Sequence, residues 1–415
     1  MRGKRELPRK RPPILLFVLI FAAGFLAGTL FWHFHPPGAS VPSGGTVTLP
    51  EGPVGTDVSS EPESPPAPPQ DEEPSAEPTP FVISFLGDCT LTSSHHTNHF
   101  EKLVGDDYAY PFSNVAEILL ADDLTLANLE CSFSPRRLES DSEYAFCGDP
   151  NYVQALVLGG VEAVTLSNNH TRDFGDAGLR DTETALAEYG VAGIPGNQGQ
   201  CFELRHDNGD TLRLGAYVHP FNGSAKQMED GCKRLKDEGA DILVAFMHAG
   251  AEKAYVPTKR QTALAHAAVK GGADVVVGTH PHVLQPIEAY QGSVILYSIG
   301  NFCFGGNRNP SDKDTVIAQL TVSGTGGDRS WEMSYIPCSV SSVSNRNDYR
   351  PTPYPPDTVA YRRCFQKLDG TFRPPVPKPE EETAPLPPEP TLDAEPLSPL
   401  PDGGVICDPP AKPEE

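Results

Sequence analysis

Six short apolar runs, each closing with polar residues, most constrain the fold of this chain. They begin with FVISFLGD at position 81 and end with VILYSIGNF at position 294, and between them stand LTLANLE, AVTLSNNH, DILVAFMHAG and DVVVGTHPH. Helix-like stretches separate several of these runs, and some end in glycine, as a helix C-cap does. Buried strands that alternate with helices predict an α/β layered fold over residues 81–345. The later runs TVIAQLTVS and SWEMSYIPCSV alternate polar and apolar residues, which predicts antiparallel strands near a sheet edge.

Two histidines one residue apart, His280 and His282, follow the run DVVV in the motif GTHPH. We expect Gly278 to end this strand in a sharp turn, at the edge where open α/β sheets bind ligands. On extended backbone both imidazoles of an H-x-H motif point the same way, because strand side chains alternate. Neutral imidazole is the commonest protein ligand for metals, so the pair predicts half of a metal site. The alternative is that both histidines are structural.

Carboxylate, amide and imidazole groups close the other apolar runs as well. If the strands are parallel neighbours, one edge of the sheet gathers all these groups around a cation. A mixed oxygen and imidazole set suits Mn, Zn or Fe better than Ca, so we expect one or two divalent ions of this kind. The candidate metal ligands are Asp88, Glu130, Asn169, His248, His280 and His282.

The same blocks resemble the CapA proteins of poly-γ-glutamate capsule biosynthesis, within the calcineurin-like metallophosphoesterase superfamily. The resemblance covers about residues 81–322 and rests on FLGDCTL, LANLECSFS, LSNNHTRDFGDAGLRDT, HAGAE and GADVVVGTHPHVLQPIEAYQGSVILYSIGNFCF. It implies a four-layer α/β/β/α metallophosphoesterase-like sandwich with the metal centre at the strand ends.

The resemblance also implies roles for individual residues. Asp88 matches the first aspartate ligand, Glu130 the bridging carboxylate and Asn169 the amide ligand, whereas His170 matches a histidine that assists chemistry without binding metal. The remaining imidazole ligands are His248, His280 and His282. Two positions depart from the family pattern: Thr90 stands where D-x-H has its histidine, and Glu130 stands where an aspartate is usual. One metal position therefore lacks a ligand, and we expect one ion to bind tightly and a second weakly or never.

Four further residues are candidates for lining the site or holding its ligands. Asn128 and Glu252 could replace the missing ligand or form hydrogen bonds to the others. Asp173 could orient His170 through a hydrogen bond. Asn301 could line the pocket, and the alternative is that it only fixes a turn.

The two ends of the chain differ in composition from its middle. Residues 14–32 contain nineteen residues without a charge, enough to cross a hydrocarbon core of about 30 Å, and residues 1–13 are strongly basic. We therefore expect a cytoplasmic basic segment at 1–13 and one transmembrane helix at 14–34, with the C-terminal domain outside the cell; a cleaved signal peptide is the alternative. The proline-rich and acidic compositions of residues 35–80 and 346–415 predict a disordered linker and tail.

These features lead to two hypotheses of function. The first is a membrane-anchored, extracytoplasmic, metal-dependent hydrolase or transferase that acts on a phosphoester or on the γ-glutamyl polymer. In it, His170 would protonate the leaving group or stabilise charge that develops in the transition state. The second is a non-catalytic scaffold in a complex that synthesises and exports an anionic polymer. The resemblance implies partners of the CapB and CapC kind, and a net charge of −23 argues against binding of nucleic acid.

Overall fold

The structure is a computed structural model that describes residues 79–374, apart from residues 95, 137–138, 141 and 143. The predicted basic segment at 1–13, the transmembrane helix at 14–34, nearly all of the linker and the tail beyond residue 374 lie outside these residues. Within the described part of the chain, no helix has the length and apolar character needed to span a bilayer. The eight cysteines that the structure describes are free thiols.

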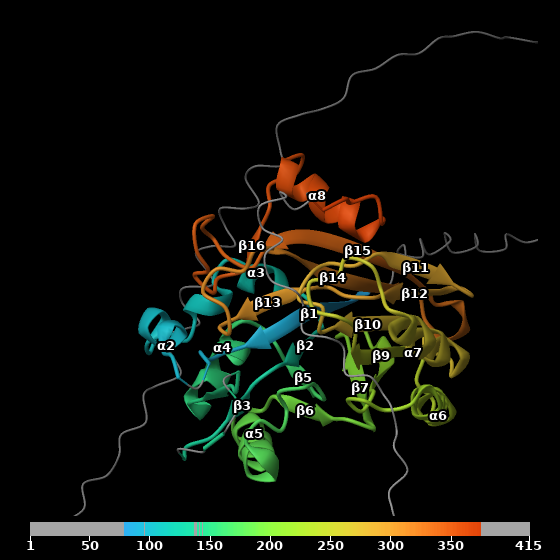
Figure 1. Ribbon diagram of the computed structural model, residues 1–415. Coiled ribbons are helices and arrows are strands. Elements are labelled where there is room, and N and C mark those ends of the chain that lie inside the picture. The colour runs from blue at the N-terminus through green and yellow to red at the C-terminus, as the bar shows by residue number, and fades with distance from the viewer. Residues whose placement is uncertain (1–78, 95, 137–138, 141, 143, 375–415) are drawn as a thin grey trace, which may run out of the picture. The chain divides into compact units, whose positions relative to one another are not determined.

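The first of two large sheets has eight strands, in the order β16-β15-β14-β1-β2-β5-β6, with β13 paired to the end of β1 (Figure 1). Its parallel part is β1 (Phe81–Thr90), β2 (Leu124–Leu129), β5 (Ala163–Leu166) and β6 (Ala192–Pro195). The late strands pair in antiparallel fashion on the other side of β1, as their alternating sequence predicts. Their bounds are β14 (Asp314–Ser323), β15 (Ser330–Ser339) and β16 (Thr352–Pro353), while β13 spans Asn301–Phe304.

The second large sheet has six strands in the order β11-β12-β10-β9-β8-β7. Four of them are parallel: β8 (Thr211–Val218), β9 (Ile242–His248), β10 (Val275–Thr279) and β12 (Ser293–Leu296). Antiparallel partners close both edges, β7 (Gln198–Arg205) beside β8 and β11 (Ile287–Tyr290) beside β12. Three of the six apolar runs form β9, β10 and β12 in this second sheet, so the condition that all six are parallel neighbours in one sheet is not met.

The helices follow the strands in chain order. They are α2 (His99–Val104), α3 (Ala116–Leu119), α4 (Val153–Leu158), α5 (Gly175–Tyr189), α6 (Ala225–Asp237), α7 (Lys259–Lys270) and α8 (Val359–Leu368). Short elements complete the chain: β3 (Ser132–Phe133), β4 (Cys147–Gly148), η2 (Tyr110–Phe112), η3 (Pro150–Tyr152) and η4 (Gly326–Asp328). Helices α6 and α7 each begin with a capping box, Ser224 with Gln227 and Thr258 with Gln261, which satisfies N–H groups that a helix start leaves free.

Three buried clusters hold these elements together. One contains side chains of both sheets, and within it the rings of Phe85 on β1 and Phe246 on β9 lie 5.9 Å apart. A second packs β2 against α4 and α5, with Leu129 and Leu186 among its members. The third packs β9 and β10 against α6 and α7, which lie beside this sheet in Figure 1. Burial of apolar surface on both faces of each sheet explains why their central strands are almost wholly apolar.

Helix α8 lies within residues 346–415, for which the composition predicts disorder, and that prediction is wrong for residues 346–374. Lys367 of this helix is 3% exposed, and its Nζ lies 2.5 Å from Asp312 Oδ2 and 2.7 Å from Asp314 Oδ2. Arg363 donates to both carboxylate oxygens of Asp314 at 2.6 Å. The helix sequence VAYRRCFQKL contains no proline and folds onto β14. The prolines on either side of it dominate the composition of residues 346–415, which is why composition alone predicted disorder.

Candidate metal centre

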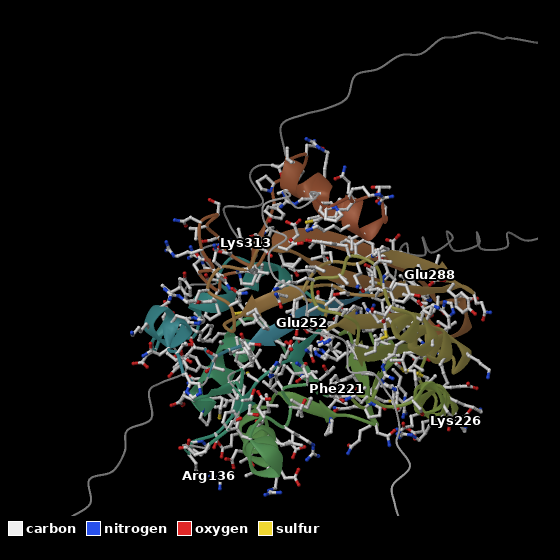
Figure 2. The ribbon with its side chains drawn as sticks, viewed as in Figure 1. Arg136, Phe221, Lys226, Glu252, Glu288 and Lys313 are labelled. Atoms are coloured by element: carbon white, nitrogen blue, oxygen red, sulfur yellow. The ribbon has the colours of Figure 1, made fainter. Side chains whose placement is uncertain are left out.

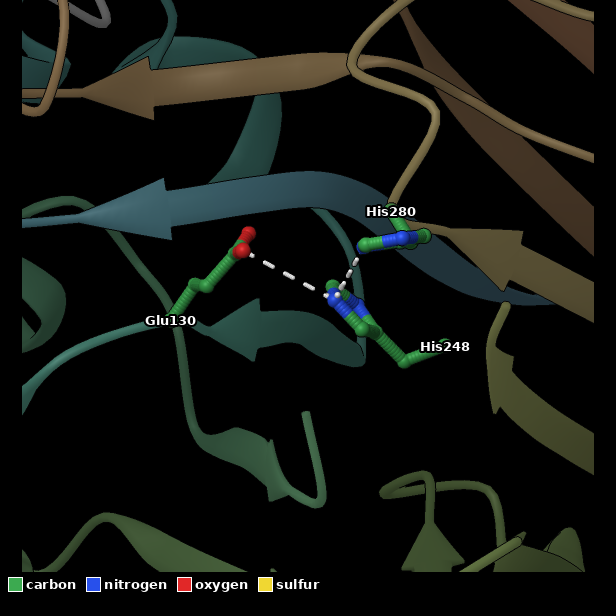
Figure 3. A group of neighbouring side chains, drawn as sticks. All are labelled: Glu130, His248 and His280. Atoms are coloured by element: carbon green, nitrogen blue, oxygen red, sulfur yellow. Dashed lines mark hydrogen bonds and ion pairs between the residues drawn. The ribbon is translucent and has the colours of Figure 1, made fainter. Parts of the chain in front are cut away.

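Carboxylates from the first sheet and imidazoles from the second meet at the carboxyl ends of their strands. Asp88 lies near the end of β1 and Glu130 directly follows β2, whereas His248 ends β9 and His280 follows β10. Figure 3 shows Glu130, His248 and His280 pointing toward one another from these elements. A Cβ atom at Gly87 would lie 1.9 Å from the main-chain oxygen of Gly300, so glycine is required where this backbone approaches β1 beside Asp88.

Glu130 is the central residue of the site. Its side chain is fully buried, and neither carboxylate oxygen has a hydrogen-bond partner within the described part of the chain. Its Oε1 lies 3.6 Å from His248 Nε2 and 3.9 Å from His282 Nε2. Burial raises the pKa of Glu130 well above its ordinary value, and the charge of Asp88 adds to the rise. An unpaired carboxylate is costly in a protein interior, so this oxygen pair fits a cation better than an empty space.

Two overlapping groups of side chains can each hold a metal ion. The first is Glu130 with His248 and His280, and the second is Glu130 with Asp88 and His282. In each group the ligand atoms lie within 4.8 Å of one another, and Glu130 belongs to both. Carboxylate oxygen and imidazole nitrogen are ligands that Mn, Zn and Fe share. These residues therefore fit one divalent ion, or two with Glu130 between them.

The backbone at His280 and His282 differs from the expected extended form. Strand β10 ends at Thr279, and the φ angles of the two histidines are 96° and 57°. The prediction that both rings point the same way because they lie on a strand is therefore wrong. A loop brings them to the site instead: His280 Nδ1 lies 3.1 Å from His248 Nε2, and His282 Nδ1 lies 3.2 Å from Asp88 Oδ2.

Gly278 also has a different role from the one expected. It lies within β10 and not at a turn, and a Cβ atom there would lie 2.1 Å from the main-chain oxygen of Tyr297. Glycine at this position lets the chain that follows β12 pass close to β10. This close approach carries the chain toward Asn301, whose Oδ1 lies 2.8 Å from His282 Nδ1.

Asn128 connects the carboxylate and amide groups below the candidate metal position. Its Nδ2 donates to Asp88 Oδ1 at 2.8 Å, and its Oδ1 accepts from Asn168 Nδ2 at 3.1 Å. Sequence reasoning missed Asn168, which is the first amide of NNH, and chose Asn169, whose Oδ1 lies 2.7 Å from His248 Nε2. The motif offers both amides, and only the direction of the backbone distinguishes them.

Two threonines support the site without belonging to either candidate ligand group. Thr279 Oγ1 lies 2.9 Å from His248 Nδ1, a contact that the sequence did not suggest. Thr90, which stands where the family pattern has a histidine, donates its Oγ1 hydrogen to the main-chain oxygen of Glu130 at 3.1 Å. Its hydroxyl therefore fixes the backbone that carries the central carboxylate.

His170 lies beside the candidate metal position and faces two carboxylates. Its Nδ1 is 2.8 Å from Asp173 Oδ2, and its Nε2 is 3.9 Å from Glu130 Oε1. Asp173 Oδ2 also accepts the main-chain N–H of Phe146 at 3.0 Å, and the Phe146 ring packs 4.6 Å from the His170 ring. The ring is thus fixed on one side and open to the cleft on the other.

The shifted pKa values of the buried histidines and of Asp88 are consistent with a site in which a cation replaces a proton. Burial lowers the pKa of His248 well below its ordinary value, so this ring is neutral and free to act as a ligand. Burial also opposes charge on His282, but the charges of Glu130 and Asp88 outweigh it and raise the pKa of His282 to about 10. Burial raises the pKa of Asp88, and the hydrogen bond and charge of His282 reverse this, leaving the pKa of Asp88 below its ordinary value.

A cleft of about 740 Å³ opens over these groups. Asn169, His170, His282 and Asn301 form part of its floor and walls, and Glu252 lies exposed on its wall near the centre of Figure 2. Lys253 lines the same cleft beside Glu252. The cleft is large enough for a segment of an extended substrate next to the candidate metal position.

Comparison with known proteins places the chain in a family. The model of the "Bacterial capsule synthesis protein PGA_cap" matches residues 82–306, more than half of the chain. The chain belongs to the PGA_cap family. All the predicted metal ligands of this PGA_cap chain, and His170, fall inside the matched residues.

The relatives of this PGA_cap chain include two Bacillus proteins. The chain is 29% identical to "Capsule biosynthesis protein CapA" of Bacillus anthracis, over 59% of this chain and 65% of that protein. It is 30% identical to "PGA biosynthesis protein CapA" of Bacillus subtilis (strain 168), over 59% of this chain and 68% of that protein. The chain therefore spans about two thirds of the length of these relatives. Among solved structures, TT1561 of Thermus thermophilus is matched with a TM-score of 0.34 and 10% identity, over 58% of this chain and 94% of that chain, a likeness too low to carry an argument.

Proposed function

We propose that this PGA_cap chain is a metal-dependent hydrolase or transferase that acts on an anionic polymer of the capsule, such as poly-γ-glutamate. The observation that carries the proposal is the buried carboxylate of Glu130, which has two unpartnered oxygens and lies 3.6 Å from a neutral imidazole of His248. Because Glu130 belongs to both candidate ligand groups, it would hold one divalent ion or bridge two. A bound cation would lower the pKa of a water molecule and neutralise charge on an anionic substrate oxygen.

The side chains around the cleft would donate a proton and hold the metal ligands in position. Asp173 holds the His170 ring through Nδ1, which keeps Nε2 directed toward Glu130 and the cleft. From this position His170 would donate a proton to the leaving group, the role of a general acid. Asn301 fixes His282 and Asn128 fixes Asp88, so both ligands are held in place before a cation binds.

The fold supports the same assignment. Buried side chains lie between the two large sheets and between each sheet and its helices. We propose that this packing is the four-layer α/β/β/α sandwich of the metallophosphoesterase-like proteins. The candidate metal centre then lies where the strand ends of the two central layers meet.

Location and partners are part of the proposal. The uncharged run at residues 14–34, with the basic residues 1–13 before it, supports a single-pass anchor in the cell membrane with the domain outside. The names of the Bacillus relatives refer to capsule and PGA biosynthesis. We therefore propose that the domain works with membrane synthase components of the CapB and CapC kind.

One observation favours a second candidate function, a non-catalytic scaffold of the polymer complex. Thr90 occupies the position of a family histidine, and its hydroxyl bonds the main chain instead of facing a metal. A second ion would then have fewer ligands than the family pattern provides. A scaffold tolerates a weakened metal position better than an enzyme does.

Metal analysis and turnover by the full chain distinguish the two functions. We expect the purified protein to contain Mn, Zn or Fe and to hydrolyse bis(p-nitrophenyl) phosphate or cleave a γ-linked oligoglutamate. His170→Ala should retain the metal and lose turnover. A metal-free wild-type protein, together with turnover that is absent or unaffected by His170→Ala, would support the scaffold.

A further inference from the structure

A second pocket, of about 440 Å³, lies next to the cleft over the candidate metal centre. Its lining contains two arginines, Arg308 and Arg346, together with His99. Asn309 lines both this pocket and the metal cleft, so the two hollows adjoin. We call the second hollow the arginine pocket.

Two loops form the arginine pocket, and buried hydrogen bonds hold them together. Asn347 is 3% exposed, and its Nδ2 donates to the main-chain oxygens of Phe304 and Asn307, both at 2.9 Å. The main-chain N–H of Asn347 donates to the oxygen of Arg308 at 2.8 Å. These bonds place the backbone of Arg308 beside the residue that follows Arg346. Buried hydrogen bonds therefore fix the backbone of the pocket, and its shape does not depend only on exposed side chains.

Further bonds fix other parts of the pocket lining. Lys313 Nζ donates to Asn309 Oδ1 at 2.6 Å and to the main-chain oxygen of Ser344 at 3.2 Å, which joins the same two loops. Tyr349 is 2% exposed, and its hydroxyl lies 2.6 Å from His99 Nδ1. This contact ties helix α2 to the loop that carries Arg346.

The two arginines of the pocket are exposed at the protein surface. Among the described residues, no ion pair joins Arg308 or Arg346 to an acidic side chain. The acidic residues nearby face other partners: Glu101 Oε1 accepts from Thr92 Oγ1 at 2.7 Å, and Asp348 Oδ1 accepts from Ser341 Oγ at 2.9 Å. In a chain of net charge −23, two exposed guanidinium groups without ion-pair partners beside a metal cleft form a local anion site.

We propose that the arginine pocket binds carboxylates of a γ-linked glutamate polymer whose neighbouring segment occupies the metal cleft. This inference rests on the proposed function and adds a second contact region for the same substrate. Each residue of such a polymer keeps one free carboxylate, and the planar guanidinium of arginine binds a carboxylate through two parallel hydrogen bonds. Asn309 lies where the polymer passes from one hollow to the other. The arginine pocket then sets affinity and register, while the groups around Glu130 act on the bond.

Binding of a γ-linked oligoglutamate of about ten residues to the full chain tests the proposal without requiring turnover. The double variant Arg308→Gln/Arg346→Gln removes both charges at exposed positions, so folding should be retained and a thermal melt checks it. Loss of two charge-assisted contacts should weaken binding on the order of tenfold or more and reduce its dependence on salt concentration. Arg308→Lys/Arg346→Lys should recover part of the affinity, because it restores charge without the planar fork.

The matched control is Lys226→Gln/Lys233→Gln on helix α6. It removes the same charge from a second basic surface whose lysines form ion pairs with Asp230 and Asp237 within their own helix. Lys226 lies on the opposite side of the view from Lys313, which contacts the arginine-pocket loops (Figure 2). We expect this control to change the affinity by less than about twofold.

The remaining outcomes separate this proposal from the proposed function. Glu130→Gln in the presence of EDTA should lose metal and turnover yet keep its Arg308-dependent affinity for the oligoglutamate. Equal affinity of the wild type and the double arginine variant would overturn the pocket assignment while leaving the metal chemistry intact. Inorganic polyphosphate of similar length that binds as tightly, with the same arginine dependence, would overturn the assignment to a carboxylate polymer.

Discussion

Nδ1 of His170 lies 2.8 Å from Oδ2 of Asp173. The carboxylate accepts the hydrogen on Nδ1 and holds the ring in one orientation, so the opposite nitrogen faces the cleft. That nitrogen, Nε2, is the one that lies 3.9 Å from Glu130 Oε1 at the floor of the cleft. The pair therefore fixes the ring so that, under the proposed function, Nε2 would donate a proton to the leaving group.

Removing the His170 ring should abolish proton transfer without removing the metal. For His170→Ala we expect kcat on bis(p-nitrophenyl) phosphate to fall by about 10²-fold to 10⁴-fold, the usual contribution of a general acid. Asp173→Asn should reduce kcat less, because the ring is kept but loses the carboxylate that orients it. Metal content per chain, measured alongside, should match the wild type in both variants. A fall in metal content equal to the fall in kcat would instead make His170 a ligand.

Replacing the carboxylate of Glu130 should weaken metal binding but should not lower the melting temperature of the metal-free protein. Glu130→Gln keeps the shape of the side chain but removes its charge, so tight metal binding should be lost. In the metal-free protein the same change removes a buried, unpaired carboxylate, and the melting temperature should stay equal or rise. Glu252→Gln, on the exposed wall of the cleft, should keep the metal and is the matched control. Wild-type metal content in Glu130→Gln would contradict the assignment of the centre.

Metal binding should release protons and stabilise the fold. With a pKa raised to about 10, His282 carries a proton at pH 7.5 in the metal-free protein, and a cation held by Asp88, Glu130 and His282 must displace it. Affinity should therefore increase as pH rises from 6 toward 9. Calorimetric titration in buffers of different ionisation enthalpy should detect at least about one released proton per bound ion. Saturation at 100 times the dissociation constant should stabilise the protein by about 2.7 kcal/mol, and EDTA should reverse the gain.

The docking of helix α8 should be sensitive to acid. Burial raises the pKa of Asp314, but the hydrogen bonds and charges of Arg363 and Lys367 outweigh it and lower the pKa below 3.8. A lowered folded-state pKa means that this stabilisation is fully present above pH 3.8 and is lost as pH falls through the folded value. Asp314→Asn should lower the free energy of unfolding at pH 7 by about 3 kcal/mol, because it leaves Lys367 and Arg363 short of a partner.

A control variant separates this effect from general acid denaturation. Asp230→Asn removes an exposed ion pair with Lys226 on α6 and should change the free energy of unfolding by less than about 1 kcal/mol. Denaturant titrations from pH 7 to pH 2.5 should show a smaller pH slope for Asp314→Asn than for the wild type or this control. Identical slopes for all three proteins would contradict the role of Asp314.

The strands that carry the site could be predicted because each combines an apolar run with a polar end. β2 is largely apolar and β9 is apolar up to His248, and Glu130 and His248 stand where these strands end. Their division between two sheets could not be read from these runs, because both look like central parallel strands. It depends on pairing over long distances, such as that of β1 with β14 and of β8 with β9. The hairpin of β7 and β8 was missed because β7 is partly exposed and largely polar.

Side-chain direction was harder to predict than position in the chain. The motif GTHPH identified His280 and His282, but their positive φ angles come from a loop whose course depends on neighbouring strands. Likewise NNH offered two adjacent amides, and only the structure shows that Asn168 contacts Asn128 while Asn169 contacts His248. Asp173 was found from its distance in sequence to His170, since three residues are few enough for a local contact.

Glu130 follows a strand of one sheet and His248 ends a strand of the other. An ion bound by both residues would therefore link the two sheets across their interface. The spacing of its ligands is then governed by the packing of residues that never touch it, such as the ring contact between Phe85 and Phe246. Substitutions that repack this interior would therefore change the metal affinity, and the number of ions bound, without altering any ligand.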